Sequence, residues 1–327
     1  MAGMLAIGRL WQIIREVDLE AIRRQAESPL RVAVIGETAA EADDLAVMLA
    51  AGHADAARWM VAMDADLASI QVASRPDAPV VDGPDVVVIV TRGSDRSRAM
   101  NAVWQGWLDR RTPLLHVVLG AGEGRGIVQQ EGQTATLALD ALGADGVDAL
   151  AQALFAVVEP DQRLALARQF PALRPCAFSQ LIDETSRANA GYAFSTGLAE
   201  IVPVLGVPLA IGDVVVLTKN QLVMGYRIAL AAGKEGHPRH LIAEILGVLG
   251  GGLLFRQIAR QLIGIVPVVG IVPKVAVAYG GTWAIGRAVT LWATEGRRLT
   301  AEGLRQLSRE GLGRGERAAR DFRKPEA

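Results

Sequence analysis

The sequence is short of cysteine, lysine and aromatic residues. Its 327 residues include one cysteine, Cys176, which excludes an intramolecular disulfide and is typical of a reducing, cytosolic compartment. Only four lysines occur, and the first of them is Lys219. The formal net charge is −1, so no overall basic field indicates a nucleic-acid partner, and we expect none.

Patterns that carry catalysis, metal binding or export are missing as well. The sequence has no paired-carboxylate, nucleophile-elbow or H-E-x-x-H pattern, so we expect no catalytic residue, metal or cofactor. His237 and His240 lie in a polar loop without a nearby cysteine, which favours surface residues over metal ligands. His53 is isolated, and the apolar run around His116 predicts a hydrogen-bonded core histidine. The start, MAGMLAIGRLWQIIREVD, lacks the segments of a signal peptide, so we expect a cytoplasmic location.

Apolar residues, by contrast, are abundant. They make up 51% of the chain, the mean hydropathy is +0.27, and most of this weight follows residue 176. The length allows two domains, each with its own core. The pattern predicts four segments: an amphipathic leader helix at 1–28, an α/β domain at 29–160, a helical domain at 161–296 and a charged tail at 297–327.

The first half alternates apolar strands with amphipathic helices. Helical patterns at 39–51 and 96–110 separate continuous apolar runs, which indicates a doubly wound, parallel α/β sheet. The expected strands are RVAVIG (31–36), DVVVIVT (85–91), PLLHVVLG (113–120) and TATLALD (134–140).

The position of a phosphate-binding loop after the first strand can be tested residue by residue. Counted from Gly36, the G-K-[ST] triplet would fall on Glu41, Ala42 and Asp43. A P-loop needs a lysine to neutralise phosphate charge, whereas the carboxylates here would repel it. Because no lysine precedes Lys219, the N-K-x-D guanine motif is excluded too.

A glycine-rich turn, LGAGEGRG (119–126), follows the third expected strand. Its spacing fails the G-x-G-x-x-G pattern and it leads to a strand, which favours a simple turn. The weak candidates for nucleotide binding are Gly36, Gly120, Gly122 and Gly124.

One segment resembles a known family. LALDALGADGVDALAQAL (137–154) is similar to the S-A-x-x-G-x-G-[ILV]-x-x-L segment that closes the G domain of Era/TrmE-like GTPases, with Asp140-Ala141 in place of Ser-Ala. The resemblance implies a degenerate P-loop GTPase-like domain that keeps the architecture and has lost hydrolysis.

The second half predicts only helices, at 177–200, 208–232, 240–264 and 273–295, arranged as a four-helix bundle of two hairpins. An apolar turn occurs twice, as EIVPVLGVPLAIG (200–212) and GIVPVVGIVPKVA (264–276). If the helices run up and down in turn, both apolar turns lie at the same end.

This half resembles the YcjF-type domain of unknown function, a helical module found beside or fused to Era/TrmE-like GTPase domains. The resemblance implies an inner-membrane context and no established activity. It rests on RANAGYAFSTGLAEIVPVLGVPLAIGDVVVLTKNQLVMGYRIA (187–229), FRQIARQLIGIVPVVG (255–270) and AYGGTWAIGRAVTLW (278–292).

The apolar turns are the expected membrane contacts. Charged residues in the second helix, each costing about 2.5–3.5 kcal/mol at the membrane centre, argue against a free-standing span. We therefore expect a peripheral or hairpin-inserted protein at the cytoplasmic face of the cell membrane, with lipid as its partner. Packing of the turns within the chain, or between subunits of a homo-oligomer, stays open. The expected contacts are Ile201, Val202, Val204, Leu205, Val207, Ile265, Val266, Val268, Val269 and Ile271.

Polar residues also recur inside the apolar helices. Those of the second helix are spaced by seven and share a face. They predict either an internal ion or headgroup site or interhelical contacts that fix helix register. The set is Asp213, Asn220, Arg227, Arg256 and Arg260.

Together these patterns predict a membrane-associated, non-catalytic adaptor or scaffold with a pseudo-GTPase domain. The alternatives are a GTP-binding protein or GTPase with unorthodox phosphate binding, and a soluble oligomeric structural protein, in which a protein partner or a second copy buries the turns. The basic tail favours equally a contact with anionic lipid and a solvated amphipathic helix.

Overall fold

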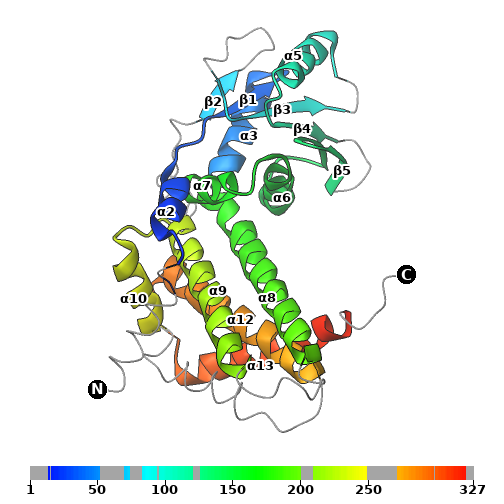
Figure 1. The fold of residues 1–327 in the computed structure, drawn as a ribbon. Helices are drawn as coiled ribbons and strands as arrows, with labels where there is room; N and C mark the ends of the chain where they lie inside the picture. The colour runs from blue at the N-terminus through cyan, green and yellow to red at the C-terminus, as the bar shows by residue number, and fades with distance from the viewer. Residues whose placement is uncertain are drawn as a thin grey trace. The chain divides into compact units, whose positions relative to one another are not determined.

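The computed structural model divides the chain into two units, Arg24–Ala177 and Met1–Arg23 with Phe178–Ala327 (Figure 1). A mostly parallel sheet lies in the first unit, and the second is helical in its described parts. The structure describes residues 14, 16–51, 70–73, 83–93, 96–120, 126–199, 209–248, 271–297 and 299–321.

The α/β unit is built on a six-stranded sheet in the order β2-β1-β3-β4-β6-β5. Every neighbouring pair is parallel except β5 and β6, which are antiparallel. The four predicted apolar runs form β1, β3, β4 and β6, whereas β2 and the antiparallel strand β5 were not among the expected strands. The strands are β1 (Val32–Gly36), β2 (Ile70–Ala73), β3 (Val86–Arg92), β4 (Leu114–Leu119), β5 (Gly126–Glu131) and β6 (Thr134–Leu139).

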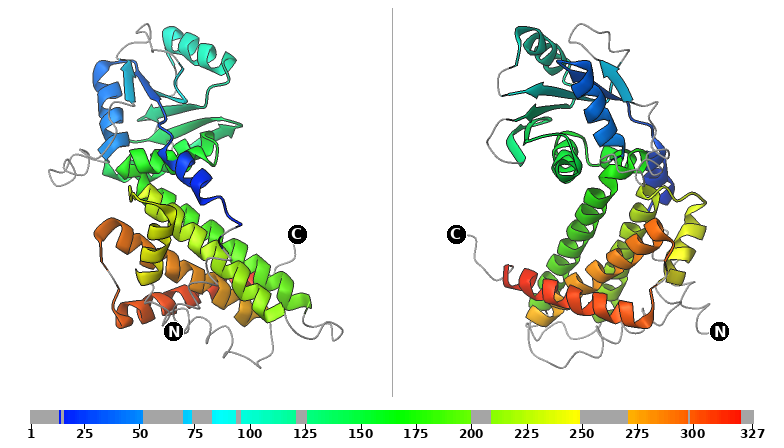
Figure 2. Two further views of the ribbon diagram at one scale, coloured as in Figure 1. Left: turned by 60° about the vertical axis from the view of Figure 1, so that its left-hand side comes forward. Right: turned by 180° about the vertical axis from the view of Figure 1, so that it is seen from behind.

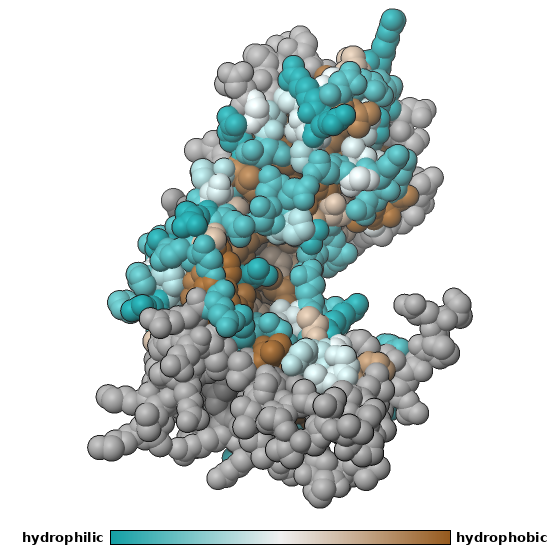
Figure 3. Space-filling model, viewed as in Figure 1, coloured by the Kyte–Doolittle hydropathy of each residue, from teal (hydrophilic) through white to brown (hydrophobic). Residues whose placement is uncertain are grey.

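Helices cover both faces of this sheet. Figure 1 shows α5 (Arg98–Asp109) on one face and α3 (Ala39–Ala51) and α6 (Val147–Val157) on the other. The face of the α/β unit visible in Figure 3 is mostly hydrophilic, with small scattered hydrophobic patches. We expected this domain to end at residue 160, but the α/β unit also contains α7 (Gln162–Gln169) and the 3-10 helix η3 (Pro171–Leu173). A second 3-10 helix, η2 (Ala144–Gly146), leads into α6.

The leader is interrupted before helix α2 (Leu19–Glu27). Residues 16–18 are not helical, and the Asp18 carboxylate accepts a hydrogen bond of 2.8 Å from the backbone N–H of Ala21. An aspartate in this position ends one segment and caps the next, because it satisfies an N–H of the first helical turn. The expectation of one continuous leader helix at 1–28 is therefore wrong.

The helical unit contains α8, α9, α10, α12 and α13. The predicted helices at 177–200, 208–232 and 273–295 correspond closely to α8, α9 and α12. The helix predicted at 240–264 is described only as far as Val248. None of the helices in the described residues is long and apolar enough to span a membrane. Their bounds are α8 (Arg174–Ala199), α9 (Leu209–Ala231), α10 (Pro238–Val248), α12 (Ile271–Glu295) and α13 (Ala301–Asp321).

Helix α13 packs back on α12 through small residues (Figure 2). A Cβ atom built on Gly280 would lie 2.5 Å from the carbonyl carbon and oxygen of Gly311, and one on Gly315 would overlap the carbonyl oxygen of Ala276. Glycine at these positions lets the two backbones approach closely. Of the two alternatives for the charged tail, the solvated amphipathic helix does not hold for this face, where Gly311, Gly315 and Ala319 are buried.

Candidate functional site

The carboxyl ends of β1 and β3 form the first candidate site. In an open parallel sheet, ligands bind in the crevice where the strand order reverses, and here that point lies between β1 and β3. In this sheet the residues that follow the two strands are Glu37 and Thr38 after β1, and Gly93 after β3. The geometry of these residues decides whether a phosphate group can bind.

The connection from β1 to α3 is only two residues long. Gly36 ends β1, and α3 begins at Ala39. The Thr38 hydroxyl accepts a 3.3 Å hydrogen bond from the backbone N–H of Glu41, which fixes this early helix start. A Cβ atom at Gly36 would lie 2.6 Å from the carbonyl oxygen of Thr38, so the first turn of α3 packs directly on the strand end. The concave loop that cradles phosphate in a P-loop is absent from this described segment.

Two carboxylates are bonded to the N–H and guanidinium groups that could have bound an anion here. Glu37 accepts a 3.3 Å hydrogen bond from the backbone N–H of Ser97, the N-cap residue of α5. Glu41 forms an ion pair of 3.1 Å with Arg92. The second carboxylate oxygen of Glu41 is buried without a hydrogen-bond partner among the described residues. A negative group buried in this position would repel phosphate.

His116 is held in a chain of hydrogen bonds on β4. The Nε–H of Arg96 donates to its Nδ1 at 3.2 Å, and its Nε2 lies 2.8 Å from the Thr91 hydroxyl. Because a guanidinium only donates, the proton of the neutral ring is on Nε2, which donates to Thr91. Burial, with the Arg96 charge, lowers the pKa of His116 to about 4. The expected core histidine is confirmed.

The glycine candidates and the remaining histidines do not form a site in the described residues. Gly36 serves helix packing, and Gly120 has a φ of 68° in the turn after β4, a conformation that favours glycine. The rings of His237 and His240 lie 6.1 Å apart, and within the described part of the chain no three His, Cys, Asp or Glu side chains are placed to hold a metal ion. Gly122, Gly124 and His53 lie outside the described residues.

A buried polar network joins three helices of the helical unit. The Asn189 side chain on α8 donates to the Thr282 hydroxyl on α12 at 2.8 Å and accepts from Asn220 of α9 at 2.7 Å. Gln221 of α9 also donates to Thr282, at 3.1 Å. Asn189 and Thr282 are fully buried, so these bonds favour one helix register over others.

Only part of the predicted polar stripe belongs to this network. Asn220 takes part in it, whereas Arg227 is exposed to solvent. The side chain of Asp213 and the residues Arg256 and Arg260 lie outside the description. The sequence pattern did not identify Asn189 and Thr282, because their partners are on other helices.

The predicted membrane contacts lie outside the described residues. Residues 200–208 and 249–270 are not described, so the two apolar turns are described only where they enter α9 at Leu209 and α12 at Ile271. No protein-family model matches the chain, and searches of curated proteins and of solved structures find no match.

Proposed function

We propose that this chain is a non-catalytic, membrane-associated adaptor or scaffold. In this proposal a degenerate GTPase-like domain is joined to a YcjF-type helical bundle of two hairpins, whose apolar turns contact the cytoplasmic membrane face. The observation that carries the proposal is the direct packing of α3 on Gly36. A phosphate-binding loop needs space at that point, and the backbone of Thr38 takes it.

The charges around this point support the same conclusion. Glu37 and Glu41 engage the N–H of Ser97 and the Arg92 guanidinium, groups that could otherwise bind a nucleotide phosphate. No lysine precedes Lys219, so none can reach across the sheet edge from within the α/β unit. The domain therefore keeps a nucleotide-binding architecture without the groups that catalysis requires.

The direction of the helices supports the membrane half of the proposal. Gln221 on α9 donates to Thr282 on α12. Farther toward the C-termini of both helices, Gly225 on α9 lies near Val289 on α12. Because both contacts advance in the same sense, α9 and α12 run in the same direction. Each of these helices follows one apolar turn in the sequence. The starts of α9 and α12, to which the two apolar turns lead, therefore lie at the same end of the helical unit, as joint contact of the turns with one surface requires.

Titration of the full chain with GTP and magnesium tests the non-catalytic half. We expect no magnesium-dependent binding by calorimetry up to about 1 mM GTP, and no phosphate release above the buffer rate. The same titration without magnesium is the control. Magnesium-dependent binding that is lost on changing Gly36 or the 120–126 loop would instead establish a GTP-binding protein with unorthodox phosphate binding.

A further inference from the structure

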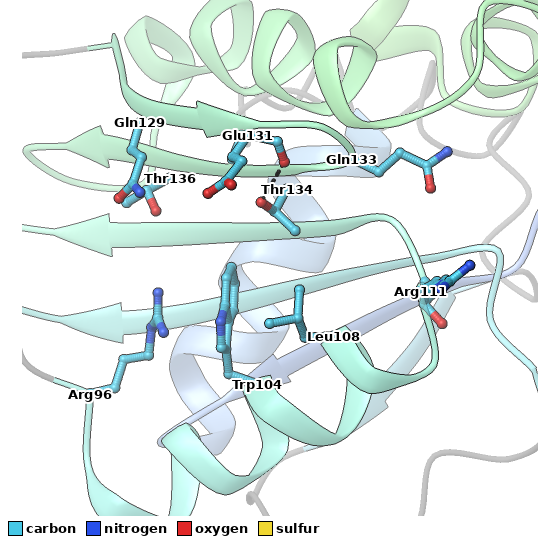
Figure 4. A pocket seen from close by; sticks show the side chains of 11 residues that line it. Arg96, Trp104, Leu108, Arg111, Gln129, Glu131, Gln133, Thr134 and Thr136 are labelled. Carbon is cyan, nitrogen blue, oxygen red and sulfur yellow. Dashed lines mark hydrogen bonds between the residues drawn. The ribbon is translucent and has the colours of Figure 1, made fainter.

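The α5 face of the sheet is only partly covered. The chain passes from β4 to the parallel strand β6 through the edge strand β5 instead of through a helix. Among the described residues, no helix packs on β5 and β6 from the α5 side (Figure 4). Parallel neighbours are usually joined by a crossover helix, which would cover this area.

The side chains on the α5 face of the sheet are apolar where α5 covers them and polar where no described helix does. Across the strands, residues in register form rows on the α5 face. The β1 and β3 members are buried apolar residues beneath α5, whereas the β5 and β6 members are polar. A polar half-face is suited to water or to a polar ligand, and not to another apolar helix. The two rows are Ala33-Val87-Leu114-Thr134-Glu131 and Ile35-Ile89-His116-Thr136-Gln129.

A cleft of about 660 Å³ lies between α5 and this polar half-face. Trp104 and Leu108 of α5 form one wall, and Gln129 and Thr136 project from the strands of the other wall toward Arg96 (Figure 4). The volume is within the range of small-molecule sites.

Arg96 is fixed in place at one end of the cleft. Its Nε–H is bonded to His116, and its guanidinium carbon lies 3.9 Å from the centre of the Trp104 ring. These contacts orient the guanidinium plane, and among the described residues they leave its two terminal NH₂ groups available. Within the described residues, no carboxylate forms an ion pair with Arg96. Burial lowers the pKa of Arg96, which indicates a partly desolvated cation.

Hydrogen-bond donors converge on the same end. Thr136 on β6 is paired in register with His116 on β4, whose Nδ1 accepts the hydrogen bond from Arg96. Gln129 on β5 is paired in register with Thr136. A guanidinium, a hydroxyl and an amide can each donate to an oxyanion, and a pre-oriented arginine binds one through two parallel hydrogen bonds.

We propose that this cleft binds a small organic anion, whose carboxylate or phosphate oxygens are held by Arg96 with Thr136 and Gln129 as flanking donors. Glu131 occupies the adjacent row and lines the same cleft. It accepts a hydrogen bond from a hydroxyl or amine of the ligand and excludes a second negative charge there.

Calorimetric titration of the full chain with inorganic phosphate, and separately with lactate, a monocarboxylate that carries a hydroxyl, tests this site. We expect at least one probe to bind with a Kd of about 1 mM, since so small an anion supplies few contacts. Arg96→Gln should weaken binding at least about tenfold, which corresponds to one charge-assisted contact. Whichever probe binds identifies the anion class.

Arg110→Gln is the matched control, because Arg110 also stacks on a tryptophan, Trp107, at 4.7 Å but does not line the cleft. We expect it to change Kd less than about twofold. Thr136→Val should weaken binding about threefold and decides the matter if Arg96→Gln does not fold. The proposal is overturned if neither probe binds at about 10 mM, or if the Arg96 or Thr136 variant binds as tightly as the wild type.

The outcome of the GTP titration is independent of the outcome of the anion titration of the cleft. It measures magnesium-dependent binding and hydrolysis at Gly36, whereas the cleft is titrated without magnesium. GTP that binds without magnesium and is lost in Arg96→Gln is therefore assigned to the cleft.

Discussion

Replacing Gly280 with alanine is expected to destabilise the helical unit by about 2 kcal/mol. The new Cβ atom would lie 2.5 Å from backbone atoms of Gly311 on α13, and backbone cannot rotate aside as a side chain can. The helices must separate, and the loss of packing outweighs the gain of about 1 kcal/mol that alanine brings to a helix interior. Urea unfolding followed by circular dichroism measures the change.

The neighbouring glycine provides the matched control. A Cβ atom at Gly281 meets nothing within 4 Å, so Gly281→Ala should stabilise the protein by up to about 1 kcal/mol. The same contrast holds on α13, where Gly313 is open and Gly311 faces Gly280. Equal effects of the two α12 variants would contradict the close packing of α12 on α13.

Lowering the pH from 7 to 5 is expected to cost the α/β unit about 2 kcal/mol through His116 alone. The pKa of His116 is about 4 in the fold, against 6.5 for the free side chain, so between these values the unfolded chain binds more protons. This stabilisation is fully present above pH 6.5 and is lost as the pH falls toward 4. Burial is the main cause, and the Arg96 cation at 3.2 Å adds to it.

His116→Gln removes this titration while keeping a polar side chain opposite Thr91. Its free energy of unfolding should fall less steeply between pH 7 and pH 5 than that of the wild type. Carboxylates contribute equally to both proteins, so the difference between the two slopes isolates the histidine. Parallel pH profiles would mean that His116 is not held neutral by its surroundings.

The short connection after β1 shows how much local pattern could predict. The apolar run ending at Gly36 and the helical run from Ala39 predicted β1 and α3 correctly, because hydrophobic periodicity is a local property. The S/T-x-x-E pattern of Thr38 and Glu41 also lay in the sequence and indicates a helix start. Applied to this segment, it would have predicted a two-residue connection and thus no room for phosphate.

The packing of α13 could not be predicted in the same way. Its charged residues are typical of a solvated helix, and only Gly311, Gly315 and Ala319, at intervals of four, indicate a second face. Small residues permit close approach but do not identify the partner. That Gly280 is the partner follows from the chain turning back after α12, which is a tertiary property.

The cleft and the buried network were missed for a related reason. Arg96, Thr136 and Gln129 come from a loop and two strands that meet only in the folded sheet. Asn220 was predicted from its spacing, but its partners Asn189 and Thr282 are distant in sequence. No periodicity within one element records such pairings.

Flotation of the full chain with liposomes of phosphatidylethanolamine and phosphatidylglycerol, with and without GTP and magnesium, tests the central claim most directly. We predict that the wild type floats equally in both conditions, and that a variant with Val204, Leu205, Val268 and Val269 changed to aspartate stays in the dense fraction. Flotation that requires GTP would contradict the non-catalytic adaptor and indicate a nucleotide switch. A wild type that does not float and elutes as a sharp multimer without detergent would replace the membrane-associated adaptor with a soluble oligomer.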